Sequence, residues 1–372
     1  MLGALALAFA WQAFIVHANY KGNWTALFCS GDRFPTPPAL AFEHVYHFPN
    51  SNGYDGQFYH FIAHDPLIER GLSFFIDAPS LRYGRILVPA MASLVAFGSD
   101  KRVDVSYFAV ILFFTGLGTW WLALYARHFG YDPLLGLAFL LVPAVLTSLD
   151  RMVIDIALAA LCVGWAWYNI GEKPVAVWFV LAAAGLARDT GLILVAAQVI
   201  WTFRKSGFRR SLIIATSALP LLLWHYYVAL HLTASSFQSE NLFPFSGLLP
   251  RFLHPNHYSL PTPVVIAATL TDYVALGGIV VAVVLVARNA VLRQASQIDL
   301  ALYAFGLLTA FLSAPDVWAE SYGFGRIFSP LLSLLLLVSI SKREWLPALP
   351  MAMVTPSILL VYAAQIYHAT GH

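Results

Sequence analysis

Residues 105–126 read VSYFAVILFFTGLGTWWLALYA, a run of 22 residues without a charged side chain. An α-helix rises about 1.5 Å per residue, so this run is long enough to cross the roughly 30 Å hydrocarbon layer of a bilayer. It predicts a membrane-spanning helix. Because similar runs recur on both sides of it, this stretch also decides the fold class.

Eleven apolar runs, this one included, follow one another along the 372 residues; some contain a single charged residue, and 174–187 and 190–203 are short. They cover residues 2–18, 105–126, 133–149, 152–170, 174–187, 190–203, 211–231, 263–287, 298–314, 325–341 and 345–368. Hydrophobic residues make up 59% of the chain and charged residues only 11%, which excludes a water-soluble globular protein. The net charge of +2, without basic runs among aromatics, gives no indication of a nucleic-acid partner. We therefore predict an all-α polytopic bundle of about eleven spans, forming one domain over residues 1–372 with the lipid bilayer as its partner.

Positive charge orients the predicted bundle in the membrane. Run 85–98 has only 14 residues and contains Pro89, so we interpret it as a helix that lies along the interface. When the long segment 19–103 is left out and the remaining loops are counted, ten basic residues fall on the side of the amino terminus and four on the other side. The ten are Arg127, Lys173, Arg204, Lys205, Arg209, Arg210, Arg288, Arg293, Lys342 and Arg343, and the four are Arg151, Arg188, Arg251 and Arg326. Because cytoplasmic loops carry the excess of Lys and Arg, the amino terminus is predicted to be cytoplasmic.

Two long polar segments then lie on the extracytoplasmic side. Residues 19–103, after the first span at 1–18, form an outer loop with short helices around 57–75 and 85–98, and residues 232–262 form a second outer loop. Spans 2–7 occupy residues 104–231, and spans 8–11 occupy residues 263–372. The acids and arginines near membrane depth also fall on this outer side: Asp55, Asp150, Asp189, Asp316, Glu320 and Arg326. Such charges usually face a cavity or a partner, which predicts a site on the outer face.

The first outer loop contains one carboxylate flanked closely by glycines. Residues 52–66 read NGYDGQFYHFIAHDP, with Asp55 between Gly53 and Gly56. Glycine lets the backbone adopt conformations that other residues resist, and the neighbouring aromatic rings offer stacking surface for a sugar. An ordinary Asp-Gly turn that leads into a short amphipathic helix is the alternative interpretation.

These residues resemble the GT-C superfamily of polytopic glycosyltransferases, and within it a bacterial branch. The resemblance rests on Gly-Tyr-Asp-Gly-Gln-Phe-Tyr at 53–59, Asp-Pro at 65–66, Arg-Tyr-Gly-Arg-Ile-Leu-Val-Pro at 82–89, Ala-Arg-Asp-Thr-Gly at 187–191 and Gly-Arg-Ile-Phe-Ser-Pro at 325–330. It covers most of the chain. It implies a multi-pass protein of the bacterial inner membrane that transfers a sugar from a polyprenyl-phosphate donor to a glycan, lipid or protein acceptor outside the cytoplasm.

The resemblance also implies roles for individual residues. Asp55 would be the general base that deprotonates the acceptor hydroxyl. An arginine would bind the phosphate of the donor, because guanidinium is permanently charged and forks onto two oxygens. We assign to substrate binding Tyr54, Gln57, Tyr59, Arg85, Asp150, Arg188 and Arg326. The alternative for the arginines is neutralisation of nearby acids, and the alternative for Asp150 or Asp155 is an acid favoured by the start of a helix.

Metal binding is not predicted from the sequence. His60 and His64 lie four residues apart, as in many zinc sites, but a third ligand is not evident. The two cysteines, Cys29 and Cys162, lack metal-ligand spacing, so we predict no metal site and no certain cofactor, with a divalent cation left open.

Two other functions remain alternatives. A catalytically inactive structural subunit of a membrane complex would keep the fold and also Asp55. A lipid or small-solute transporter would need ionisable residues at the bilayer midplane and broken helices, whereas the acids here gather on one face.

Overall fold

The computed structural model describes residues 1–233, 243–258, 262–292 and 296–370, and these residues are almost entirely helical. Parts of the predicted second outer loop, 234–242 and 259–261, and the basic residue Arg293 lie outside the described residues. The first helix, α1 (Leu2–Tyr20), leads into the segment that was predicted as the first outer loop. That segment contains η1 (Trp24–Phe28), β1 (Ser30–Gly31), η2 (Pro38–Glu43), β2 (His47–Phe48), α2 (Asp55–His64), η3 (Leu72–Phe75), α3 (Pro79–Tyr83) and α4 (Leu87–Val95).

The remaining elements form the helical bundle. The first half contains α5 (Asp100–His128), η4 (Pro133–Leu141), α6 (Pro143–Arg151), α7 (Asp155–Ile170), α8 (Pro174–Ala187), η5 (Asp189–Gly191), α9 (Leu192–Ser206), α10 (Phe208–Ala215), η6 (Thr216–Ala218) and α11 (Leu219–His231). The second half contains α12 (Leu248–Leu253), α13 (Thr262–Val291), α14 (Gln297–Phe311), α15 (Pro315–Trp318), α16 (Ser321–Ile327), α17 (Ser329–Lys342), η7 (Leu346–Ala348) and α18 (Leu349–Ala369).

Within the described residues, five helical stretches are long and apolar enough to cross a membrane, and seven if each of two bent pairs counts as one span. The five cover Leu2–Tyr20, Asp100–His128, Phe208–His231, Thr262–Val291 and Leu346–Ala369. The bent pairs are η4 with α6, at 62°, and α16 with α17, at 57°. The chain is therefore a multi-pass membrane protein, but the predicted count of about eleven spans is not confirmed.

The other four predicted spans are helical but short. They correspond to α7, α8, α9 and α14, which have 16, 14, 15 and 15 residues. At 1.5 Å per residue these helices rise about 21–24 Å, less than the hydrocarbon thickness.

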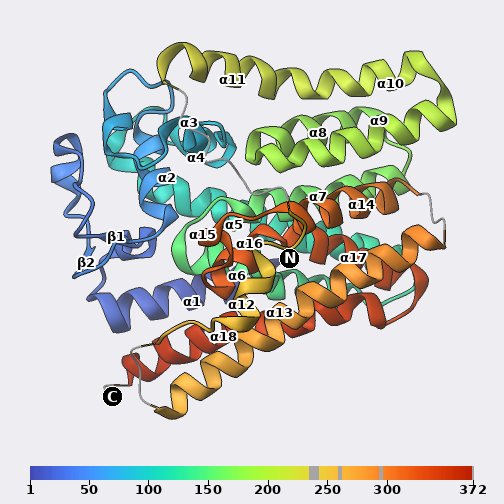
Figure 1. Cartoon of the computed structure of the whole chain (residues 1–372). Coiled ribbons are helices and arrows are strands. Elements are labelled where there is room, and N and C mark those ends of the chain that lie inside the picture. Colours follow the sequence, from blue (N-terminus) through green and yellow to red (C-terminus); the bar gives the residue numbers. More distant parts are fainter. Residues whose placement is uncertain (234–242, 259–261, 293–295, 371–372) are drawn as a thin grey trace.

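Burial follows the position of each helix in the bundle. α17 is buried continuously from Ser329 to Ile340, as expected for an apolar helix at the centre of a bundle. By contrast, α11 exposes Leu222 and Leu223 by 56% and 67%, and in Figure 1 it lies along one edge together with α10. Leucines exposed along a whole helix fit a lipid-facing surface.

The first and last helices lie beside each other. Trp11 of α1 stacks on Tyr362 of α18, with ring centroids 4.3 Å apart. The side chain of Asn19 donates a hydrogen bond to the carbonyl of Gln365 at 3.1 Å. The segment from η1 to α4 lies at one end of the bundle, where it meets α5 (Figure 1).

Candidate functional site

Two glycines determine where Asp55 lies. Gly53 has φ +71°, in the left-handed region that favours glycine. A Cβ on Gly56 would lie 2.2 Å from the carbonyl oxygen of Arg151 and 2.8 Å from that of Phe28. The chain therefore passes against two other backbones, and Asp55 becomes the first residue of α2.

Asp55 belongs to a chain of alternating arginines and aspartates. Nη1 of Arg82 lies 2.9 Å from Oδ1 of Asp55, and Nη2 of Arg326 donates to Oδ2. Nη1 of Arg326 also donates to Oδ2 of Asp155 at 3.2 Å, and Oδ1 of Asp155 accepts a bond from Arg188. Segments far apart in the sequence, α2, α3, α7, the α8–α9 turn and α16, thus meet through five charged side chains, which we call the Asp55 cluster.

Further ion pairs surround the Asp55 cluster. Arg82 donates two hydrogen bonds of 2.8 Å to Asp77. Nε of Arg85 lies 4.0 Å from Oδ2 of Asp189, whose Oδ1 is 3.1 Å from Nε2 of His225. These outer residues lie on α3, η5 and α11 and in the segments that flank α3.

Exposure increases from the inside of the cluster outward. The side chain of Asp155 is 3% exposed and that of Asp55 is 19% exposed. At the outer pairs, Asp189 reaches 40% and His225 reaches 44%. A ligand would therefore reach Asp55 from the side that α3, η5 and α11 line.

The ring of Tyr54 contacts an arginine of this cluster and also Arg151, which belongs to a neighbouring group of side chains. The guanidinium carbons of Arg326 and Arg151 lie 4.9 Å and 4.8 Å from its ring centroid. Arg151 also lies 4.6 Å from the ring of Tyr322. Such cation–π contacts hold the aromatic rings and guanidinium groups in fixed positions.

Asp150 pairs with Tyr322, Gln365 and Arg151, and none of these hydrogen bonds and ion pairs among the described residues involves Asp55. Its carboxylate accepts hydrogen bonds from Tyr322 at 3.1 Å and from Gln365 at 2.6 Å, and lies 3.5 Å from Nε of Arg151. Its side chain is only 2% exposed. Its bonds fix α6 to α16 and α18, so the predicted contact with substrate is not favoured by this geometry.

Tyr59 and Gln57 on α2 are buried, as are Asp150 and Arg188. The hydroxyl of Tyr59 accepts a 3.4 Å bond from Nη1 of Arg85. Nε2 of Gln57 donates to the carbonyl of Asn52 at 2.8 Å, and its Oε1 accepts from the backbone N–H of Gly31 at 3.2 Å. Gln57 thus shapes the loop before α2, because both ends of its amide are used by backbone. The assignment of Gln57 to substrate binding stays a prediction, and the structure shows its amide hydrogen-bonded to backbone at both ends.

The charges of the cluster favour the ionised form of Asp55. Burial raises the pKa of its carboxyl, but the guanidiniums of Arg326 and Arg82 outweigh burial and hold the pKa well below its usual range. The start of α2 adds the positive end of a helix dipole. Nε of Arg85 and Nε of Arg326 are buried and have no hydrogen-bond partner among the described residues. The site therefore combines a fixed carboxylate with unused donors for an anion.

The structure adds two residues that the sequence analysis did not choose. Arg82 is part of the Arg-Tyr-Gly-Arg motif, from which only Arg85 was assigned to substrate binding. Asp155 was interpreted as an acid at the start of a helix, but it joins Arg188 to Arg326. The motif carried a signal for Arg82, whereas nothing local in the sequence indicates the partners of Asp155.

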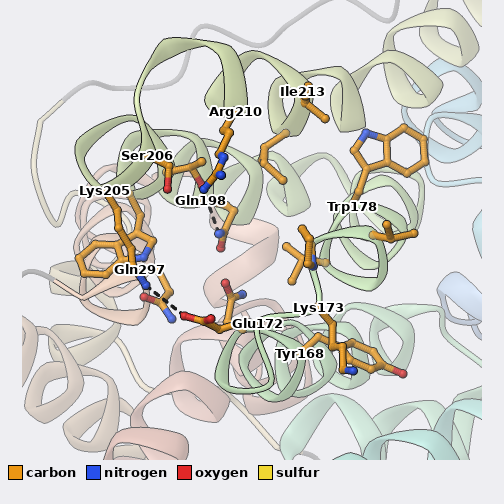
Figure 2. Close-up of a pocket in the computed structure, with 17 residues that line it drawn as sticks. Tyr168, Glu172, Lys173, Trp178, Gln198, Lys205, Ser206, Arg210, Ile213 and Gln297 are labelled. Carbon is orange, nitrogen blue, oxygen red and sulfur yellow. Dashed lines mark hydrogen bonds and ion pairs between the residues drawn. The ribbon is translucent and has the colours of Figure 1, made fainter.

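A separate cavity of about 1130 Å³ opens at the carboxyl-terminal end of α7, whereas Asp155 lies at the amino-terminal end of this helix (Figure 2). Its lining includes Tyr168, Trp178, Lys205 and Arg210, and none of the predicted site residues. Tyr168 lies 13 residues after Asp155 on the same helix, which corresponds to about 20 Å along the axis. The cavity and the Asp55 cluster are therefore distinct places in the bundle.

Compared with models of known protein families, with curated proteins and with solved structures, the chain matches none of them.

Proposed function

We propose that this protein is a membrane glycosyltransferase that moves a sugar from a polyprenyl-phosphate donor to an acceptor outside the cytoplasm of a bacterium. The observation that carries the proposal is the Asp55 carboxylate held between Arg82 and Arg326. The reaction needs these two functions side by side, a carboxylate to accept a proton and guanidiniums to hold a departing phosphate. The multi-pass bundle would give a polyprenyl chain access from the bilayer.

The depressed pKa of Asp55 sets a condition on this chemistry. A carboxylate bound to two arginines is a weak base, and efficient general bases have pKa values nearer the working pH. The donor phosphate would compete with Asp55 for Arg326 and Arg82. Once it binds, Asp55 loses part of its positive surroundings and its pKa rises, so the base becomes effective only when the donor is present.

The transfer step then needs only one residue, Asp55, to accept a proton. The acceptor oxygen forms a bond to the anomeric carbon, and the bond from that carbon to the phosphate oxygen breaks. The hydroxyl proton passes to Asp55, and the bonding electron pair leaves with the polyprenyl phosphate. Arg326 and Arg82 stabilise the charge that develops on the phosphate.

The proposal is tested with Asp55→Asn in the full-length protein purified in detergent and supplied with radiolabelled polyprenyl-phosphate sugars. We expect release of polyprenyl phosphate to fall by about 10²–10⁴-fold, the usual contribution of a general base. Asp316→Asn is the matched control, because Asp316 is an exposed acid outside the Asp55 cluster. Equal activity of the Asp55 variant and the control would rule out Asp55 as the base.

Transport of an anionic lipid or solute is a second candidate. Two bent helix pairs, η4–α6 and α16–α17, meet beside the cluster, since α6 contacts α16 and Arg326 lies at the end of α16. Broken helices of this kind frame the substrate sites of many transporters. Movement of labelled polyprenyl-phosphate sugar across proteoliposome membranes, with the sugar still attached to its carrier, would favour transport over transfer.

A further inference from the structure

Four side chains with metal-binding atoms converge on one point between η2, α2 and α5. They are Glu43 at the end of η2, His60 and His64 on α2, and Asp104 in the first turns of α5. The ligand atoms, one from each residue, all lie within 4.8 Å of one another. None of these residues belongs to the Asp55 cluster.

Hydrogen bonding alone does not satisfy this arrangement. Nε2 of His60 lies 2.7 Å from Oδ1 of Asp104, 3.3 Å from Oε2 of Glu43 and 3.3 Å from Nε2 of His64. An imidazole nitrogen carries at most one hydrogen, and that hydrogen points in one direction. One N–H therefore cannot serve three neighbours, whereas a cation at their centre contacts all of them.

Glu43 is a buried carboxylate whose only close partners among the described residues are the two histidines. Its side chain is 5% exposed, and Oε2 lies 3.3 Å from Nε2 of His60, but neither oxygen accepts a hydrogen bond of good geometry. Both oxygens face the histidines, with Oε1 2.9 Å from Nε2 of His64. A buried carboxylate is costly unless it is paired or binds a metal.

The spacing of these atoms is close to that around a tetrahedral ion. Ligands at about 2.0–2.1 Å from Zn²⁺ are about 3.3 Å apart along each edge of a tetrahedron. The separations between the two histidine nitrogens and between His60 and Glu43 are both 3.3 Å. Those between His60 and Asp104, 2.7 Å, and between His64 and Glu43, 2.9 Å, are shorter and would lengthen around the ion. Two imidazoles and two carboxylates are ligands that Zn²⁺ accepts, and the two negative charges balance the ion.

A further carboxylate, which is not one of the four ligands, orients His64 through its other ring nitrogen. Nδ1 of His64 lies 2.9 Å from Oδ1 of Asp100, which Arg70 holds with bonds of 2.7 Å and 2.9 Å. Metal-binding histidines commonly use such a partner to fix the ring and its tautomer. His60 instead lies flat against the ring of Phe28, with centroids 4.0 Å apart.

We propose that Glu43, His60, His64 and Asp104 form a structural Zn²⁺ site. The ion would tie η2 and α2 to α5, and so fix the segment between α1 and α5 on the bundle. α2 has Asp55 as its first residue and His64 as its last, so the same ion would hold the helix that presents Asp55. The site does not depend on the proposed transfer reaction, because its direct readout is metal content.

The test is the zinc content of the full-length protein, purified in detergent without chelators and measured by mass spectrometry of the elements. We expect about one zinc ion per chain in the wild type and its loss in His64→Gln and Asp104→Asn. His254→Gln is the matched control, because His254 is exposed and lies far from the four ligands in the sequence. Asp100→Asn should keep the site but weaken its zinc affinity by about 10–100-fold.

A measurement on the wild type guards against variants that fail to fold. After removal of the metal with a chelator, added Zn²⁺ should raise the melting temperature, and added Mg²⁺ should not. Zinc content well under one per chain after incubation with Zn²⁺, with an unchanged melting temperature, would overturn the proposal and leave histidine–carboxylate ion pairs only. Equal zinc loss in the His254 control would show binding at surface histidines only.

Discussion

Asp155→Asn tests how strongly the buried charges of the Asp55 cluster depend on one another. The side chain of Asp155 is 3% exposed and accepts bonds from both Arg188 and Arg326. The substitution leaves Arg188, which is 10% exposed, without a carboxylate partner among the described residues, while Arg326 still pairs with Asp55. Breaking a buried pair costs about 3–5 kcal/mol, because the remaining charge stays uncompensated. Only Arg188 loses its sole carboxylate partner, so we expect the free energy of unfolding to fall by about 3 kcal/mol, the lower end of this range.

The free energy of unfolding is measured in mixed detergent micelles, with helix content followed by circular dichroism. Asp189→Asn is the matched control, because Asp189 is 40% exposed and lies 4.0 Å from Arg85, so its loss should cost about 0–1 kcal/mol. In the double variant Asp155→Asn with Arg188→Gln, part of the stability should return, since no unpaired Arg188 remains. Equal losses in the Asp155 and Asp189 variants would refute the inference that burial makes this network sensitive.

Three further results are expected. Gly56→Ala should destabilise the protein by about 1–3 kcal/mol in the same assay, because the new Cβ would meet a backbone carbonyl at 2.2 Å, whereas Gly3→Ala has open space and should be tolerated. The pKa of Asp55 is lower in the folded chain than its ordinary value of 3.8, so its ion pairs stabilise the fold above about pH 4 and are lost as the pH falls through the folded pKa. The loss of unfolding free energy caused by Asp55→Asn should thus be constant from about pH 8 to about pH 5 and become smaller in stronger acid. A loss that becomes larger on acidification would contradict a lowered pKa of Asp55 in the folded chain. A cysteine at Glu320 should react with an impermeant thiol reagent in intact cells and one at Ser206 only after lysis, and the reverse pattern would invert the predicted orientation.

Local sequence signals predicted where helices lie. The run 174–187 corresponds to α8, Pro174–Ala187, because proline favours the first helical position and the chain leaves the helix at Arg188. The same hydropathy could not show that run 133–149 is bent. Val142 adopts φ −65° and ψ 128° before Pro143, and a residue before proline disfavours the helical region. Pro143 therefore indicated a break in the helix, but the mean hydropathy of an apolar window is not sensitive to a single proline.

Partners distant in the sequence could not be predicted in this way. Asp55 and Arg326 are 271 residues apart, and no pattern around either residue indicates that they meet. The two backbone partners of Gln57 were not predicted either, since its position in the motif indicated only a ligand. The histidine pair at 60 and 64 was visible in the sequence, but Glu43 and Asp104 come from other elements. The chemistry of single side chains could be predicted from the local sequence, whereas the contacts between them depend on how the helices pack.

The pairing of α1 with α18 also affects how the protein is made. A ribosome releases α1 first and α18 last, so the rings of Trp11 and Tyr362 cannot meet until nearly every other residue has been synthesised. Before then α1 can already pack against α5 and α6, but the side that carries Trp11 must face lipid or an insertion factor. Chains that terminate before α18 would leave α1 without this neighbour, which would give membrane quality-control proteases a way to distinguish truncated products from finished ones.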